Sequence, residues 1–216
     1  MKVYAMNGSP RRNRNTAALL NKALEGVKTE YPEAETERID LYTLNYTGCR
    51  SCFACKRKGG PSYGTCAVKD ELYPVLEKLA EADGVIFGSP IYFRTITGQL
   101  HSFYERFLYP CMTYKMGHPT LVKNKMKTAC IYTMNVTEED MLRDGYREYM
   151  GLFEMFLESY FSKPRLLMSY NTYQFDDYSK YVCETFTEAE KAAYREQYFP
   201  GDCERAYELG KMLLKG

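Results

Sequence analysis

A polar, basic turn at residues 7–16 is the first segment whose side chains could bind a ligand. It joins a predicted strand to a predicted helix, whose unpaired N–H groups and partial positive charge would attract an anion. Donors suited to phosphate oxygens follow one another in it: Ser9, Arg11, Asn15 and Thr16. The sequence has neither a Walker-type Gly-Lys-Thr ending nor a Gly-x-Gly-x-x-Gly fingerprint here. The turn therefore predicts a site for one terminal phosphate; a capped helix with a solvated turn is the alternative.

A second loop, at residues 88–98, begins with the same Gly-Ser-Pro tripeptide that the first turn contains. It presents a fixed turn, exposed backbone amides and apolar side chains close together: Pro90, Ile91, Tyr92 and Phe93. A flavin ring needs flat apolar contacts and backbone partners for its pyrimidine edge. The loop is consistent with such a site, although two aromatic residues at the end of a strand are also typical of an ordinary core.

The third chemically distinctive segment is a group of four cysteines, Cys49, Cys52, Cys55 and Cys66. Four thiolates are what a [4Fe–4S] cluster or a tetrahedral zinc ion requires. Free or redox-active thiols are the other interpretation. The remaining cysteines are scattered singly and are interpreted as structural, and the two histidines are too isolated to suggest a metal site: Cys111, Cys130, Cys183, Cys203, His101 and His118.

These segments lie between predicted strands and helices that alternate along the chain. Short apolar runs predict strands at 2–6, 36–41, 84–87, 128–134 and 165–170. Helical spacing predicts helices at 20–31, from Asp70 to about 80, at 99–109, at about 137–160, and at the carboxyl terminus with an interruption at Pro200-Gly201. Irregular segments are expected at 43–68, 110–125 and 171–186. This order favours a five-stranded parallel sheet with helices on both faces, whose ligands sit beyond the carboxyl ends of the strands.

The totals restrict the class of protein. At 216 residues we expect one domain spanning 1–216. A formal net charge of +1 gives no field that would draw nucleic acid. No apolar run approaches the roughly 20 residues that span a bilayer, and the amino terminus does not resemble a signal peptide. We therefore expect a cytoplasmic protein with no membrane or nucleic-acid partner, in which eight cysteines are not a disulfide framework.

Taken together, the two loops resemble those of the NADPH-dependent FMN reductase and iron–sulfur flavoprotein group, which has the flavodoxin-like fold. The similarity covers residues 1 to about 135 and includes Thr97-Gly98-Gln99-Leu100, Phe103 and Arg106 after the second loop. It implies that Ser9, Arg11, Asn15 and Thr16 hold the phosphate of FMN. It also implies that Pro90, Ile91, Tyr92 and Phe93 line the isoalloxazine, and that the loop at Thr133, Met134 and Asn135 closes over it.

The chain departs from the family pattern in three places. His101 stands where the family often has Lys, and Met134-Asn135-Val136 replaces a common Gly pair. The resemblance implies a compact four-cysteine motif, but the last gap is longer here, and residues 59–64 look like an insertion. The first departure would change dimer or cofactor contacts, and the second would change the outer face of the flavin site. The third changes the segment that carries the four cysteines, residues 49–66, which we call the cysteine loop.

The resemblance implies an FMN-dependent oxidoreductase that takes electrons from NAD(P)H and passes them to a small-molecule or protein acceptor. The alternative is an iron–sulfur flavoprotein that transfers electrons between ferredoxin and an acceptor. The sequence assigns no catalytic acid or base, because the flavin carries the chemistry; Tyr92 is the side chain expected nearest the reacting face. We also expect a homo-oligomer, with the aromatic helix 99–109 or the Tyr-rich stretch 170–181 against a partner. The alternative is that both segments fold back on their own chain.

Overall fold

Five parallel strands form the central sheet of the computed structural model, which describes residues 1–215. They are β1 (Lys2–Asn7), β2 (Glu35–Asp40), β3 (Gly84–Pro90), β4 (Lys127–Thr133) and β5 (Arg165–Ser169). Their order in the sheet is β2-β1-β3-β4-β5, and every pairing is parallel. This order is the flavodoxin-like one, so the predicted fold class is confirmed.

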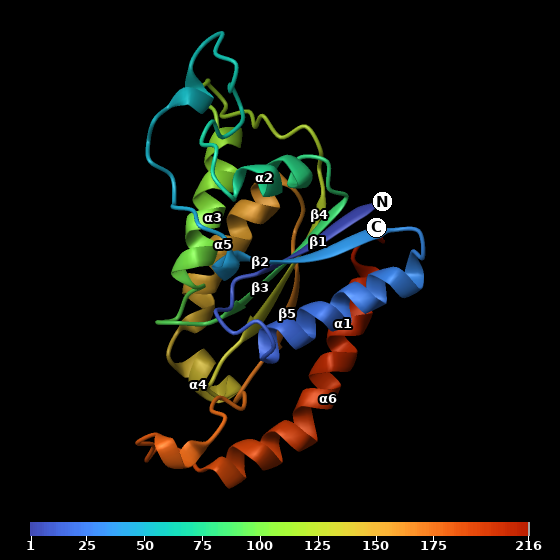
Figure 1. The fold of residues 1–216 in the computed structure, drawn as a ribbon, viewed down its shortest axis with the longest axis vertical. Helices are drawn as coiled ribbons and strands as arrows, with labels where there is room; N and C mark the ends of the chain where they lie inside the picture. Colours follow the sequence, from blue (N-terminus) through green and yellow to red (C-terminus); the bar gives the residue numbers. More distant parts are fainter. Residues whose placement is uncertain (216) are drawn as a thin grey trace.

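Helices cover both faces of the sheet (Figure 1). On one face lie α1 (Asn15–Glu30) and α6 (Glu188–Met212); on the other lie α2 (Tyr73–Leu79), α3 (Gly98–Leu108) and α5 (Tyr146–Tyr160). The remaining helical segments are short: α4 (Glu138–Arg143), η1 (Leu41–Thr43), η2 (Ala54–Lys56), η3 (Tyr109–Cys111) and η4 (Tyr178–Lys180). None of the helices within residues 1–215 has the length and apolar character that crossing a bilayer requires.

The two faces of the sheet divide the core, because successive strand residues point to opposite sides. In β1, Val3 and Ala5 pack under α1 and α6, whereas Tyr4 and Met6 face the layer of α3 and α5. The α1–α6 crossing is so close that a Cβ atom on Gly26 would lie 1.9 Å from the Tyr207 carbonyl oxygen. A Cβ atom on Gly210 would meet the Ala23 carbonyl oxygen at 1.8 Å. Glycine is therefore required on both helices where they cross.

Two predictions about the helices were wrong: one helix is broken where a continuous one was expected, and another is continuous where a break was expected. The helix expected at about 137–160 is broken between α4 and α5, where Gly145 has a positive φ of 69° that ends the first helix. The interruption expected at Pro200-Gly201 does not occur, since α6 continues through Pro200. Proline has no backbone N–H, so the carbonyl one turn earlier in the helix loses its hydrogen-bond donor. Because Pro200 is exposed, that carbonyl reaches water instead. Ala206 and Leu209 pack against the core and hold the helix in place. Gly216, the last residue of the predicted carboxyl-terminal helix, lies outside the described residues.

Candidate functional site

A cavity of about 140 Å³ opens where β1, β3 and β4 end. It brings together every predicted cofactor-binding residue except Phe93: Ser9, Arg11, Asn15, Thr16, Pro90, Ile91, Tyr92, Thr133, Met134 and Asn135. Four residues that the sequence analysis did not single out complete the lining: Arg14, Thr172, Tyr173 and Gln174. The first turn, the second loop and the segment after β4 therefore form one site at the carboxyl edge of the sheet.

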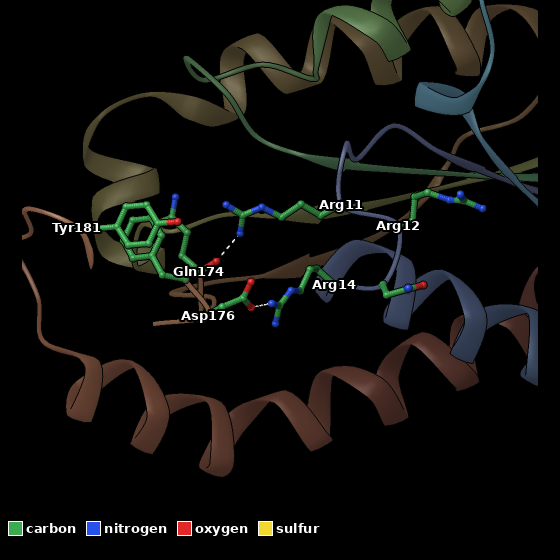
Figure 2. A pocket seen from close by; sticks show the side chains of 8 residues that line it. Arg11, Arg12, Arg14, Gln174, Asp176 and Tyr181 are labelled. Atoms are coloured by element: carbon green, nitrogen blue, oxygen red, sulfur yellow. Dashed lines mark hydrogen bonds and ion pairs between the residues drawn. The ribbon is translucent and has the colours of Figure 1, made fainter. Parts of the chain in front are cut away.

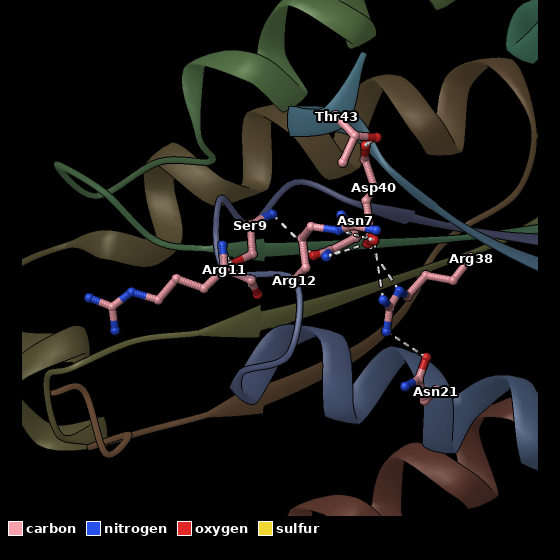
Figure 3. Close-up of polar contacts among 8 residues, drawn as sticks. All are labelled: Asn7, Ser9, Arg11, Arg12, Asn21, Arg38, Asp40 and Thr43. Carbon is pink, nitrogen blue, oxygen red and sulfur yellow. Dashed lines mark hydrogen bonds and ion pairs between the residues drawn. The ribbon is translucent and has the colours of Figure 1, made fainter. Parts of the chain in front are cut away.

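The shape of the first turn depends on a carboxylate at the end of β2 (Figure 3). The Asn7 side chain donates to Asp40 Oδ1 at 2.8 Å, and Asn7 Oδ1 accepts the Ser9 N–H at 3.1 Å. Arg12 Nε reaches Asp40 Oδ2 at 3.1 Å, so this guanidinium is turned away from the cavity. Asp40 thus fixes the beginning and the middle of the turn that we call the phosphate loop, residues 8–14.

The hydrogen-bond partners of Asp40 keep its side chain ionised. Burial alone would raise its pKa, but hydrogen bonds from Asn7, Arg38 and Arg12 keep the pKa of this carboxyl below its ordinary value. Arg38 supplies two of these bonds, from Nε at 3.0 Å and from Nη2 at 3.2 Å, and itself binds Asn21 on α1. The ionised carboxylate therefore ties β1, β2 and α1 together beneath the phosphate loop.

Hydroxyl groups and a helix start supply the polar floor of the cavity. The Ser9 hydroxyl is buried and accepts the Arg11 N–H at 3.1 Å, which sets the curve of the loop. The hydroxyls of Thr16 and Thr133 lie 2.8 Å apart and join α1 to the end of β4. Helix α1 begins at Asn15, and its first N–H groups lack intrahelical acceptors. This arrangement suits an anion because the helix start adds a partial positive charge.

The Tyr-rich stretch after β5, residues 170–181, covers the cavity, and we call it the closing segment. Arg11 donates to the Gln174 carbonyl, and the Asn15 amide donates to the Tyr173 carbonyl at 2.9 Å. Arg195 on α6 donates in turn to Asn15 Oδ1 at 2.6 Å. The Tyr-rich stretch therefore lies over the phosphate loop of its own chain. Its tyrosine content was a signal for a site, but the sequence did not tell which loop it would meet.

The two Gly-Ser-Pro loops are joined directly. The Gly8 N–H donates to the Gly88 carbonyl at 2.8 Å, and the Thr97 hydroxyl donates to the Gly8 carbonyl at 2.7 Å. A Cβ atom on Gly8 would stand 2.8 Å from Leu100 Cβ, so only glycine allows this approach. Because Thr97 caps α3 by accepting the Leu100 N–H, the loops and this helix form one unit.

Phe93 lies outside the cavity because of the turn that carries it. Backbone hydrogen bonds between Tyr92 and Thr95 close a two-residue turn in which Phe93 and Arg94 both have positive φ, 50° and 70°. Such a turn favours Asn or Gly, so two bulky residues there are strained. The Phe93 side chain is 101% exposed, whereas Tyr92 faces the cavity and burial raises its pKa.

A buried lysine holds the loop after β4 from behind. Lys191 on α6 is 2% exposed and donates to the Asn135 carbonyl at 2.8 Å and to Asn171 Oδ1. Its ammonium lies 4.3 Å from the centre of the Phe186 ring. Burial lowers its pKa to about 8. Lys191 therefore fixes one wall of the cavity to the same helix that supplies Arg195.

The four cysteines line a separate cleft at the far end of α3. Cys49 and Cys52 are exposed and Cys55 is buried, and burial raises the pKa of the Cys55 thiol. The cleft measures only about 20 Å³. Within residues 1–215 no three Cys, His, Asp or Glu side chains converge closely enough to ligate one metal ion. The donor chemistry matches the predicted metal site, but the thiols as they lie here are not gathered around a metal.

Charged side chains on and beside α3 hold this cysteine loop. Glu105 accepts the Cys49 N–H at 2.8 Å. The Arg106 guanidinium, 2% exposed, binds Asp70 at 2.6 Å and reaches the Cys66 sulfur from Nε at 3.2 Å. Lys56 donates to backbone carbonyls that follow the helix, including that of Met112 at 2.6 Å. Helix α3 is thus attached to the cavity at its beginning and to the cysteine loop at its end.

An all-parallel sheet with a polar, basic turn after β1 and an aromatic loop after β3, both lining one cavity at the strand ends, defines a flavodoxin-like protein. Residues 1–134 match the family described as NADPH-dependent FMN reductase. The chain belongs to that family.

Curated relatives match over about half of the chain. An iron-sulfur flavoprotein of Archaeoglobus fulgidus is 40% identical over 106 residues, which are 49% of this chain and 48% of the relative. One of Methanocaldococcus jannaschii is 38% identical over 106 residues, 49% of this chain and 51% of the relative. The chain therefore aligns with about half the length of the curated relatives that it matches.

Solved structures show the same fold over the whole chain. An NAD(P)H:quinone oxidoreductase from Methanothermobacter marburgensis superposes with a TM-score of 0.71 at 17% identity, covering 100% of this chain and 98% of that one. An FMN-dependent NADH-azoreductase from Bacillus anthracis, solved in complex with FMN, gives a TM-score of 0.67 at 13% identity and covers 100% of both chains. At these identities the similarity establishes the fold alone.

Replacing Asp40 by Asn should destabilise the protein and loosen the phosphate loop, because the cationic partners of Asp40 would lose their carboxylate. Since the folded-state pKa of Asp40 is lowered, its contribution is present above the unfolded pKa of about 4 and is lost as pH falls below it. Urea unfolding of wild type and Asp40→Asn at pH 7 and pH 3 should show a stability difference that shrinks in acid. A difference that is equal at both pH values would contradict this role. Exposed Glu184→Gln serves as the control.

Proposed function

We propose that this chain is an FMN-dependent oxidoreductase that takes electrons from NAD(P)H and passes them to a small-molecule or protein acceptor. FMN, when bound, would supply the redox chemistry at its ring. The protein would bind the phosphate through the phosphate loop and the start of α1, and would place the ring against Pro90, Ile91 and Tyr92. The acceptor is left as a class because the described side chains around the cavity do not select one.

The observation that carries this proposal is that hydrogen-bond donors suited to a phosphate and an aromatic loop line the same cavity. Ser9, Arg11 and Thr16 lie at one end of it, and Tyr92 lies on the second loop. Anionic groups bind well where a helix start and a guanidinium meet, and an apolar loop suits a flat ring. Membership of the NADPH-dependent FMN reductase family supports the same assignment.

The size of the cavity indicates how the cofactor would sit. At about 140 Å³ it is smaller than the roughly 300–1,000 Å³ usual for small-molecule pockets. It has room for a phosphate and part of a sugar chain, and the ring would lie at its open side beside Tyr92. Arg11 would exchange the Gln174 carbonyl for phosphate oxygens. The donor set fits FMN, and the segment after β5 would have to give up this contact for Arg11 to reach the phosphate.

Replacing Arg11 by Ala should weaken FMN binding by roughly tenfold or more, because a charge-assisted hydrogen bond contributes about 1.5–3 kcal/mol. Riboflavin, which lacks the phosphate, should bind the variant and the wild type almost equally. Flavin fluorescence titration measures both ligands. Arg57→Ala, an exposed guanidinium on the cysteine loop, is the matched control for loss of charge. Equal losses for FMN and riboflavin would show that Arg11 acts through the shape of the loop.

A second function is favoured by the cysteine loop. We propose as the alternative an iron–sulfur flavoprotein that transfers electrons between ferredoxin and an acceptor, with Cys49, Cys52, Cys55 and Cys66 as ligands of a [4Fe–4S] cluster. All four thiols line one cleft, and the curated relatives are named iron-sulfur flavoproteins. The cleft would have to open to hold a cluster, since it is too small as it lies.

Anaerobic purification followed by iron and sulfide analysis tests this alternative. If the cluster forms, the visible spectrum should show a broad iron–sulfur absorption beside the flavin bands, and Cys66→Ala should lose it. Cys203→Ala, a thiol outside the cleft, should keep it. Flavin bands alone after anaerobic reconstitution with iron and sulfide would leave the NAD(P)H-dependent enzyme as the function.

We also propose that the chain forms a homo-oligomer, but through a surface other than those suggested by the sequence. The aromatic rings of α3 are internal: Phe103 is fully buried and Phe107 is 8% exposed. The outer face of α5 instead exposes an apolar stripe beside the second loop, made by Tyr149, Leu152, Met155 and Phe156. A second copy of the chain would cover this stripe.

Light scattering of the FMN-loaded protein at micromolar concentration should therefore give a mass above that of the 25.1 kDa chain. Leu152→Glu should convert the assembly to monomers because it places a charge in the apolar stripe, whereas Leu166→Glu, also exposed but on β5, should not. A monomeric wild type that remains monomeric on concentration would refute the proposal.

A further inference from the structure

Two segments meet at the end of the molecule that carries the cysteine loop, away from the flavin cavity (Figure 1). One comprises residues 49–69, and the other is the connection between α3 and β4, residues 109–126. Lys56 on the first segment donates to three backbone carbonyls of the second, including that of Met112 at 2.6 Å. The two segments therefore form one surface, which we call the basic end.

The basic end lies in a part of the sequence that has no acidic residues. Asp and Glu are absent from residues 41–69 and 106–127, whereas these two ranges hold ten Lys and Arg residues. All 28 acidic residues lie elsewhere, together with the other 19 Lys and Arg residues. The rest of the chain is therefore net negative, and the formal charge of +1 for the whole chain does not reveal this separation.

Most of the basic side chains of this end face solvent without a partner. Seven are exposed: Arg50, Arg57, Lys58, Lys69, Lys115, Lys123 and Lys125. Within residues 1–215 none of the seven forms an ion pair with a carboxylate. The carboxylates that border the two ranges are bonded to other groups of the chain: Asp70, Glu71 and Glu105. The positive charge of the basic end is thus left open.

The guanidinium groups beside the flavin cavity are arranged differently (Figure 2). Arg11 donates to the Gln174 carbonyl, and Arg14 pairs with Asp176. The chain therefore supplies its own partners for positive charge at that end of the molecule and supplies none at the basic end. Unpaired like charges repel one another, so gathering them on one surface favours a partner of opposite charge.

Exposed apolar side chains lie among these charges. Phe53 is 52% exposed, Tyr114 is 69% exposed and Met116 is 97% exposed. Phe53 has a positive φ of 56° on the cysteine loop, and its ring packs edge-on against Tyr109 with centres 6.4 Å apart. The Tyr109 hydroxyl lies 2.9 Å from that of Tyr114. Aromatic side chains surrounded by a polar, charged rim are typical of protein–protein interfaces.

A compact acidic partner suits this surface better than an extended polyanion. Nucleic acid or an anionic membrane would also extend over the net-negative remainder of the chain, which would repel it. We propose that the basic end docks an acidic protein, with Phe53 and Tyr114 as apolar anchors and Lys58 and Lys115 in the charged rim. This inference rests on the proposed function, which leaves the acceptor as a small molecule or a protein. It names an acidic protein and the surface that receives it.

Isothermal titration of the FMN-loaded protein with a strongly acidic ferredoxin as the probe tests this assignment. Affinity should fall by about tenfold or more when NaCl rises from about 20 mM to about 200 mM, because salt screens exposed charges. Lys58→Glu and Lys115→Glu should each weaken binding about fivefold at low salt, and their effects should multiply in the double variant. Phe53→Ala should weaken binding by a similar factor at both salt concentrations. Lys28→Glu, an exposed charge reversal on α1, is the matched control and should change nothing.

A wild type that does not bind the ferredoxin at low salt would overturn the inference. Equal losses for Lys28→Glu and Lys58→Glu would overturn it too, because only net charge would then matter. A single-stranded oligonucleotide and vesicles containing phosphatidylserine should bind more weakly than the ferredoxin. If either bound as tightly, the basic end would be an unspecific polyanion surface and the assignment would be wrong.

FMN affinity, measured separately on each variant, keeps this inference apart from the proposed function. FMN binding without docking of the ferredoxin refutes only the inference. Docking by a chain that does not bind FMN refutes only the proposed function.

Discussion

The buried carboxylate of Asp40 is the interaction on which the site depends. It ends β2, and its hydrogen bond with Asn7 connects it to the end of the neighbouring strand β1. Through Asn7 it positions the Ser9 N–H, and through Arg12 it holds the middle of the phosphate loop. A loop of polar residues would otherwise sample many conformations, at an entropic cost of about 1–2 kcal/mol per residue fixed. Asp40 therefore sets the geometry before any ligand enters.

Helix α3 connects the two chemically distinctive parts of the chain. Its first turn is joined to the phosphate loop through the Thr97–Gly8 hydrogen bond, and its last turn supports the cysteine loop through Glu105 and Arg106. Eleven residues of helix span about 16 Å, at 1.5 Å per residue. A rigid helix of this length keeps a fixed separation between the cavity and the thiols. The two sites therefore share one support even though no side chain belongs to both.

The fold and most of the cavity could be predicted because their signals are local. Apolar runs, the repeated Gly-Ser-Pro loops and the position of parallel strand ends located Ser9, Arg11, Thr16 and Tyr92. The closing segment could not be assigned, since Asn15 and Tyr173 are 158 residues apart and no periodicity links them. The direction of the Phe93 side chain could not be predicted either, because it follows from positive φ angles in a turn without Gly or Asn. Helix α6 continues through Pro200 because its packing against α1 outweighs the tendency of proline to interrupt a helix. A local sequence signal does not reveal this packing.

The position of α6 has a consequence for how the protein is made. This helix is synthesised after all five strands of the sheet, yet it supplies Lys191 behind the Asn135 loop and Arg195 on Asn15. Helix α1 precedes α6 in the chain by four strands, and it finds its tightest neighbour only when Gly210 reaches Ala23. The sheet from β1 to β5 can form before α6, but the wall and the cover of the cavity cannot. A nascent chain can therefore form its sheet before the walls of the cavity are in place.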